Sequence, residues 1–150
     1  MTTSSGSVQM AAVGADALIG SWRLVSFELR SPDGSVSHPF GKDASGYLFY
    51  NEDGYMSAAF MGADRARPDS DDLSEVARGV NFDAFNAYCG RFEVRGDRVV
   101  HRVEVSSLPQ WTGSEQERVF SFEDGRLVLE TVALQIDSGV PVGVLVWERA

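Results

Sequence analysis

Three side chains in the second half of the sequence could carry out acid–base or electrostatic chemistry: His101, Glu104 and Arg118. An imidazole titrates near neutral pH, so His101 is a candidate general acid or base. Glu104 and Arg118 could pair in the interior and there anchor a ligand carbonyl. The alternatives are a structural, hydrogen-bonded histidine and an exposed cross-strand salt bridge, which would contribute little.

The segment that carries His101 and Glu104 reads as a strand over residues 99–106. Successive side chains of a strand point to opposite faces, so Glu104 and Ser106 share one face and His101 lies on the other. His101 and Glu104 are therefore rival candidates. We expect Glu104 on the inner face, opposite Arg118 of the next strand.

A second group of side chains predicts a binding pocket rather than a reaction. Aromatic side chains with a few small polar groups suit an apolar ligand that carries one or two oxygens. The alternative is a solid core with no cavity. The expected ligand-binding residues are Tyr47, Phe49, Tyr55, Ser57, Phe60, Phe85, Tyr88, Ser106 and Trp111.

Several other classes of site and partner are not expected. The two histidines are far apart in the sequence and have no close Cys or carboxylate partner, so we predict no metal site. No phosphate-cradling loop or dinucleotide motif is present, and we predict no cofactor. The net charge of −9 disfavours nucleic acid and anionic membrane surfaces as partners. The oligomeric state is left open.

The pattern of elements predicts an all-β fold. Short apolar or alternating runs are separated by turn residues, as in a meander that closes into an antiparallel up-and-down barrel of about 8–10 strands. Helical spacing of apolar residues predicts one helical insertion over residues 71–88. The expected strands are 19–29, 35–38, 46–50, 55–61, 90–94, 99–106, 115–122, 127–132 and 140–149.

We expect residues 1–14 to be a disordered lead and residues 15–150 to be a single domain. The lead lacks the basic and apolar parts of a secretion signal. No apolar run reaches the ~20 residues that a membrane span needs. The single cysteine, Cys89, cannot form an internal disulfide. These features predict a cytoplasmic protein.

The two ends of the predicted barrel carry a family resemblance. Gly20 and Trp22 in the first strand, with Arg149 in the last, resemble the closing motif of lipocalins and their calycin relatives. The resemblance implies that Trp22 plugs one end and that Arg149 packs across it in a cation–π contact. An ordinary core tryptophan and a solvated terminal arginine are the alternative.

The whole series of motifs is similar to the lipocalin-like domain family of short bacterial and fungal proteins. Where that family often shows two consecutive histidines, this chain has His101 followed by Arg102. The similarity implies the barrel but leaves the function open, since related folds act as carriers and as natural-product cyclases. The motifs are Gly20–Ser26, Pro39–Gly41, Asp53–Ser57, Val100–Ser106, Pro109–Gly113, Gln116–Arg118 and Leu145–Arg149.

Three functions remain open on this basis. The favoured one is a binding protein that holds a small, largely apolar metabolite inside the barrel. The second is a cofactor-independent isomerase or cyclase that acts on a polyketide-like or other natural-product intermediate in the same pocket. The third is an interaction protein with a filled barrel and an acidic exterior.

Overall fold

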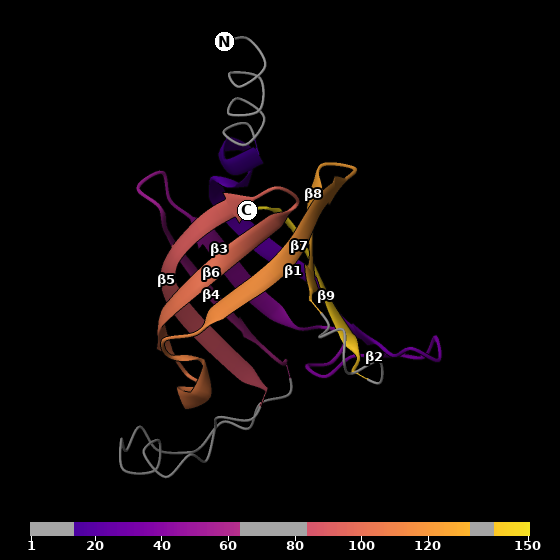
Figure 1. The fold of residues 1–150 in the computed structure, drawn as a ribbon. Helices are drawn as coiled ribbons and strands as arrows, with labels where there is room; N and C mark the ends of the chain where they lie inside the picture. Colours follow the sequence, from indigo (N-terminus) through magenta and orange to yellow (C-terminus); the bar gives the residue numbers. More distant parts are fainter. Residues whose placement is uncertain (1–13, 64–83, 133–139) are drawn as a thin grey trace.

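The computed structural model describes residues 14–63, 84–132 and 140–150 (Figure 1). Its elements, in chain order, are β1 (Gly20–Arg30), β2 (Val36–Ser37), β3 (Ser45–Tyr50), β4 (Tyr55–Met61), β5 (Phe85–Arg95), β6 (Arg98–Ser106), the 3-10 turn η1 (Pro109–Trp111), β7 (Glu115–Glu123), β8 (Arg126–Thr131) and β9 (Val142–Arg149). A short helix over residues 14–18 precedes β1.

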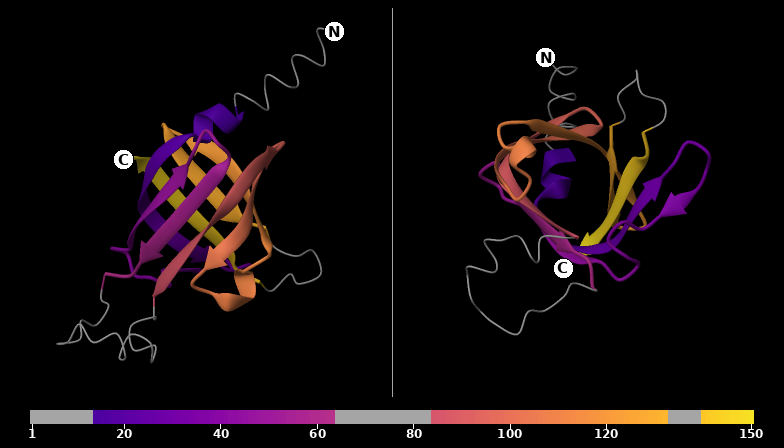
Figure 2. Two further views of the ribbon diagram at one scale, coloured as in Figure 1. Left: turned by 90° about the vertical axis from the view of Figure 1, so that its left-hand side faces the viewer. Right: turned by 90° about the horizontal axis from the view of Figure 1, so that it is seen from below.

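The strands form a closed antiparallel barrel, as predicted. From β3 to β9, each strand pairs with the next along the chain, and β1 pairs with both β3 and β9. Eight strands therefore complete the ring, while β2 is a short extra strand on the far part of β1. The ring is visible when the molecule is viewed along its axis (Figure 2). Closure leaves no long unpaired edge among the ring strands.

One end of the barrel is sealed by the start of the chain. The side chains of Leu18 and Trp22 are fully buried there, and the Trp22 indole donates a hydrogen bond of 2.8 Å to the carbonyl of Leu18. The guanidinium of Arg149 lies 3.9 Å from the centre of the Trp22 ring. It also donates to the carbonyls of Ala17 and Ile19, at 2.8 and 2.6 Å. The cation–π contact expected from the sequence is present.

Gly20 is required where these groups meet. Its φ of 128° lies in a region that side-chain-bearing residues rarely adopt. A Cβ at this position would approach an Arg149 guanidinium nitrogen to 2.5 Å. Glycine therefore allows the arginine to cross the end of β1.

Two β-bulges set which side chains face inward at the other end. On β1 the pairing with β9 shifts between Leu24 and Ser26, so Phe27 and Leu29 come to face the interior. On β6 the pairing with β5 skips Glu104 opposite Gly90. A Cβ on Gly90 would overlap the carbonyl of Arg102, so glycine permits the close approach at this bulge.

The structure corrects one boundary of the sequence interpretation. Phe85 and Tyr88 belong to β5, not to a helical insertion, because residues 85–88 pair with β4. Residues 71–83 of the expected insertion and residues 1–13 of the expected lead lie outside the described residues. No helix in the described ranges is long and apolar enough to cross a membrane. Those same ranges contain no cluster of three potential metal-ligating side chains.

Candidate binding cavity

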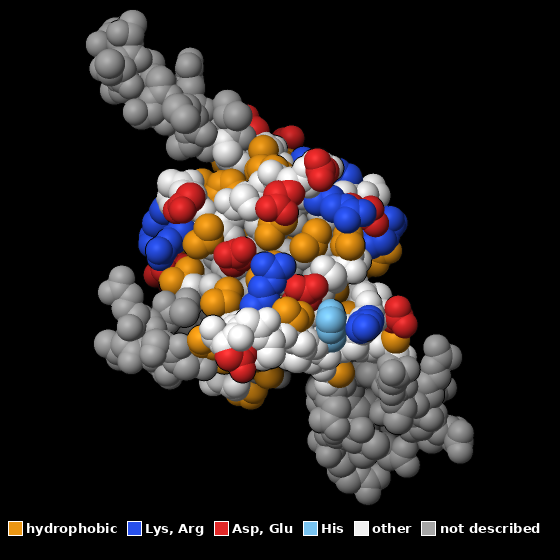
Figure 3. All heavy atoms as spheres, turned by 90° about the vertical axis from the view of Figure 1, so that its right-hand side faces the viewer, with side chains coloured by type: hydrophobic (Ala, Val, Ile, Leu, Met, Phe, Trp, Pro, Cys, Tyr) orange, Lys and Arg blue, Asp and Glu red, His pale blue; other side chains and the backbone are white. Residues whose placement is uncertain are grey.

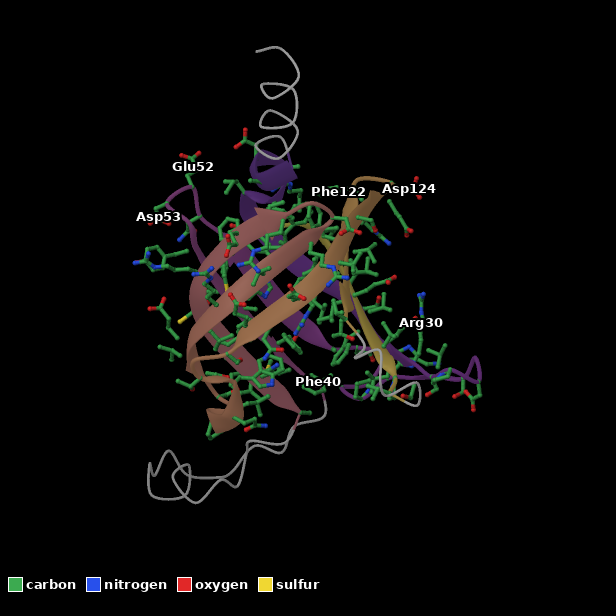
Figure 4. The ribbon with its side chains drawn as sticks, viewed as in Figure 1. Arg30, Phe40, Glu52, Asp53, Phe122 and Asp124 are labelled. Carbon is green, nitrogen blue, oxygen red and sulfur yellow. The ribbon has the colours of Figure 1, made fainter. Side chains whose placement is uncertain are left out.

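The end of the barrel opposite the Trp22 plug contains a cavity of about 520 Å³. A volume of this size is typical of small-molecule sites, which span roughly 300–1,000 Å³. Phe40 marks this end in Figure 4, whereas Glu52 and Phe122 mark the sealed end. The described lining residues are Phe27, Leu29, Phe40, Phe60, Ala84, Phe85, Asn86, Leu108, Trp111, Arg118, Thr131, Pro141, Gly143 and Leu145.

Three phenyl rings pack together in the cavity wall. Phe27 of β1 and Phe40 of the β2–β3 connection meet edge to face, with ring centres 5.4 Å apart. Phe60 of β4 lies 5.7 Å from the Phe27 ring and 5.4 Å from the Phe40 ring. Aromatic pairs at these separations stabilise one another, so this wall is preorganised. Phe60 also packs edge-on against the buried Trp147 ring, 6.4 Å away.

Arg118 supplies the charge in this apolar wall. Its side chain projects inward from β7 and the residue is only 8% exposed. One guanidinium nitrogen donates a 2.8 Å hydrogen bond to the carbonyl of Glu117. Its Cζ lies 5.8 Å from the Trp111 ring centre. A guanidinium has five N–H donors, so these contacts leave donors available to a bound molecule.

His101 lies behind this wall and is completely buried. Its Nε2 is 2.6 Å from the Tyr50 hydroxyl, and its Nδ1 is 2.9 Å from the Tyr88 hydroxyl. Burial and the nearby Arg118 charge lower the pKa of His101 to about 3. Burial also raises the pKa of Tyr50 and Tyr88 above their usual value. All three rings are therefore neutral at neutral pH.

The neutral imidazole makes its two hydrogen bonds in opposite senses. One ring nitrogen carries the proton and donates to its tyrosine hydroxyl, while the other nitrogen accepts from the second tyrosine. His101 therefore holds the hydroxyls of Tyr50 and Tyr88 in place in the interior.

The connection between β6 and β7 positions Trp111 at the cavity. The 3-10 turn η1 begins after Leu108, whose carbonyl accepts a 3.0 Å hydrogen bond from the Trp111 amide. The hydroxyl of Ser114 donates to the Trp111 carbonyl at 2.6 Å. The indole meets the Tyr88 ring edge to face at 5.3 Å. Trp111 is therefore held between Tyr88, Arg118 and the cavity.

The structure brings together part of the predicted site. Phe60, Phe85, Trp111 and Arg118 line the cavity. Tyr88 and His101 face the interior but lie beneath the lining. Ser106 is half-buried at the end of β6, where its hydroxyl accepts a 3.0 Å hydrogen bond from the Leu108 amide.

Four other predicted lining residues lie on the outer face of the barrel. Tyr47, Phe49 and Tyr55 are 40–45% exposed, and Ser57 shares the outward face of β4 with Tyr55. The Tyr47 and Phe49 rings stack on each other at 6.1 Å. The expectation that these residues line the lumen is wrong, because on β3 and β4 the inward positions are taken by Leu48, Tyr50, Met56, Ala58 and Phe60.

The expected Glu104–Arg118 pair is also wrong. Glu104 is exposed on the outside at the β6 bulge, whereas Arg118 faces inward. His101 and Val103 are the inward residues of this strand. Arg102 and Glu104 share one strand face, and two charges on one face indicate the solvent side. This signal was present in the sequence.

The sequence interpretation missed several lining residues. Phe27 and Leu29 face inward because of the β1 bulge, which simple alternation does not reveal. Phe40 lies within the Pro39–Gly41 motif, so that motif marks the cavity wall as well as the family. Asn86 and Thr131 add polar groups from β5 and β8.

A second hollow of about 680 Å³ lies at the sealed end. Its lining includes Asp16, Glu52 and Glu93, and it lies between the residue 14–18 helix and the ends of strands. The interior cavity is the better candidate site, because inward-facing residues of seven elements converge on it. The outer surface seen in Figure 3 mixes acidic, basic and scattered apolar side chains.

A sealed barrel with an apolar cavity at its open end is the arrangement of a lipocalin-like protein. The lipocalin-like domain family matches residues 19–150, and the chain belongs to that family.

Two known proteins are similar to this chain. Over 72 residues, the chain is 39% identical to the 4'-hydroxy-3'-methoxypropiophenone carrier protein of Aspergillus oryzae. That match covers 42% of this chain and 65% of the fungal protein, so the chain spans just under two thirds of its relative. A lipocalin-like protein from Bacteroides uniformis of known structure is 13% identical, with a TM-score of 0.48, over 89% of this chain and 99% of that one.

Proposed function

We propose that this protein binds a small, largely apolar molecule in the interior cavity and releases it unchanged. The carrying observation is the cavity itself: a preorganised aromatic wall with Arg118 as its charged member. Aromatic walls bury an apolar ligand, while a few polar groups fix its orientation. The fungal relative is named as a carrier of an aryl ketone, which supports a ligand of this chemical kind.

The character of the lining favours a binding protein over the cyclase or isomerase alternative. A general acid or base works best when its pKa lies near the working pH. The described lining residues include none that titrates near neutral pH. His101, the candidate from the sequence, lies beneath the lining, and its pKa of about 3 makes it a weak base. Arg118 could stabilise a developing oxyanion, so turnover remains a measurable alternative.

The remaining expectations about partners and location belong to this proposal. The net charge of −9 supports a protein that avoids nucleic acid and anionic membrane surfaces. A cytoplasmic carrier of a pathway intermediate would fit this charge.

A fluorescence titration with the neutral dye N-phenyl-1-naphthylamine tests the proposal. We expect saturable, one-to-one binding, and displacement of the dye by 4'-hydroxy-3'-methoxypropiophenone. Chromatography of the recovered ketone should show it unaltered. No dye binding would contradict the cavity assignment, and a changed ketone would favour the enzyme.

A matched pair of variants locates the dye. Leu29→Trp inserts an indole into the lining and should abolish dye binding. Val105→Trp places the same ring on the outer face, where Val105 is 64% exposed, and should leave binding unchanged. Equal behaviour of the two variants would place the dye outside the cavity.

A further inference from the structure

At the open end, no carboxylate among the described residues pairs with the inward-facing positive charge of Arg118. Within the described residues, every salt bridge is made by an arginine or histidine other than Arg118. A buried cation is costly unless it is paired or fully hydrogen-bonded. One wall of the cavity therefore carries a positive charge that no described carboxylate pairs with.

The acidic neighbours of Arg118 in sequence are used elsewhere. Glu117 and Glu115 flank it on β7 but point outward, as strand alternation requires. Glu117 pairs with Arg98 at 3.2 Å. Glu115 pairs with Arg102 at 3.2 Å and with Arg95 at 3.7 Å. Both carboxylates are therefore paired on the outer face, and neither of them balances the charge of the inward-facing Arg118.

The groups that face Arg118 from the surrounding elements are neutral. They are Tyr88 and Asn86 of β5, His101 of β6, Trp111 of η1, Thr131 of β8 and, further in, Tyr50 of β3. The Glu117 carbonyl occupies one donor of the guanidinium and supplies no negative charge. Because His101 stays neutral next to it, the arginine is the single charge that these described groups present to the cavity.

We propose that the cavity selects ligands with an acidic oxygen, such as an aryl phenol or enol, and binds them as the anion with Arg118 as the counterion. This inference rests on the proposed function and names its ligand class. On binding, the O–H bond of the ligand breaks and the proton leaves to the buffer. The oxygen keeps the electron pair and accepts charge-assisted hydrogen bonds from Arg118.

The test uses two probes that differ by one methyl group: 4-hydroxypropiophenone, which can ionise, and 4-methoxypropiophenone, which cannot. We expect the phenol to bind at least about tenfold more tightly at pH 8, since an ion-paired hydrogen bond is worth that factor in a buried site. The absorption band of the bound phenol should be that of the phenolate, at a pH where the free phenol is still protonated. Calorimetry in two buffers of different ionisation enthalpy should show proton release.

Variants of Arg118 and of an outer arginine separate charge from location. Arg118→Gln should remove the preference for the phenol and the proton release, so that the phenol and the ether bind this variant with similar affinity. Arg118→Lys should retain part of the preference. Arg98→Gln removes the same charge from the outer face and should change neither the preference for the phenol nor the proton release.

The outcomes distinguish the two proposals. If the dye and both ketones fail to bind the parent protein, the proposed function itself fails, and this inference with it. If the dye binds but the ether binds as tightly as the phenol, or the bound phenol keeps its proton, the cavity stands and the anion preference is wrong. Loss of dye binding in both Arg118 variants would show a structural role for the arginine and would also overturn the inference.

Discussion

Each end of the barrel holds an arginine beside a tryptophan, and the two pairs differ in what the arginine contacts. At the sealed end, Arg149 lies 3.9 Å from the Trp22 ring and donates to two backbone carbonyls. At the open end, Arg118 lies 5.8 Å from the Trp111 ring and donates to one backbone carbonyl, that of Glu117.

The same residue types therefore serve stability at one end of the barrel and binding at the other. Arg149 donates to two carbonyls of the chain itself, and Trp22 fills the barrel beneath it. Arg118 lines a hollow and keeps donors for another molecule. A protein commonly gives up some stability where it must bind, so the two ends should respond in opposite ways to substitution.

The largest expected effect is the loss of the plug. Trp22→Ala should lower the free energy of unfolding by about 3–5 kcal/mol, because it deletes a fully buried indole and leaves a cavity. Urea unfolding measures the change. Trp111→Ala is the matched control at the open end and should cost clearly less, since Trp111 is only half-buried. A larger loss of unfolding free energy for Trp111→Ala than for Trp22→Ala would contradict the different roles of the two ends.

Acid should lower the stability of the fold, because His101 stays neutral in the native state. The pKa of His101 falls from 6.5 to about 3 on folding, so between these values the unfolded chain binds more protons than the native one. Stability must therefore decrease as the pH falls below 6.5, by up to about 1.4 kcal/mol per pH unit from this residue.

The variant His101→Gln isolates that contribution. Between pH 6.5 and 5, where few carboxylates titrate, its free energy of unfolding should depend less on pH than that of the parent. Chemical unfolding at several pH values gives the two slopes. Identical slopes would mean that His101 is not held neutral.

Arg149 should contribute less to the stability of the fold than Trp22. Arg149→Gln removes the cation–π contact and the two bonds to Ala17 and Ile19, at a cost of about 1–3 kcal/mol. Arg98→Gln, which breaks a partly exposed ion pair with Glu117, should cost about 0–1 kcal/mol. Thermal unfolding ranks the two, and the reverse order would contradict the role of Arg149.

The smallest expected effect is at the open end. Arg118→Met replaces an unpaired buried cation by an apolar side chain of similar length. Without ligand, the variant should be within about 1 kcal/mol of the parent or more stable. A loss of several kcal/mol in chemical unfolding would show that Arg118 supports the fold rather than a ligand.

Strand positions and barrel closure could be predicted from the sequence because they depend on local signals. Turn residues separate the apolar runs, and Gly20, Trp22 and Arg149 mark the two strands that meet. The inward face of each strand was harder to predict. On β3, both alternating sets of residues are apolar, so Tyr47 and Phe49 could not be separated from Leu48 and Tyr50 by hydropathy.

The site was only partly predictable for a related reason. The bulges on β1 and β6 change which side chains face inward, and their positions depend on pairing with distant strands. Phe27 was missed because of the bulge on β1. Glu104 was placed inside although Arg102, two residues away, marks the same face as the solvent side.

The three tryptophans allow one direct measurement of the central claim, since Trp111, Trp147 and Trp22 lie at the open end, the interior and the sealed end. Indole N–H signals in ¹H–¹⁵N correlation spectra, assigned with Trp→Phe variants, should be followed during titration with N-phenyl-1-naphthylamine. The account predicts a saturable shift of the Trp111 signal while the Trp22 signal stays in place. A shift of Trp22 without Trp111, or no shift in either, would contradict it.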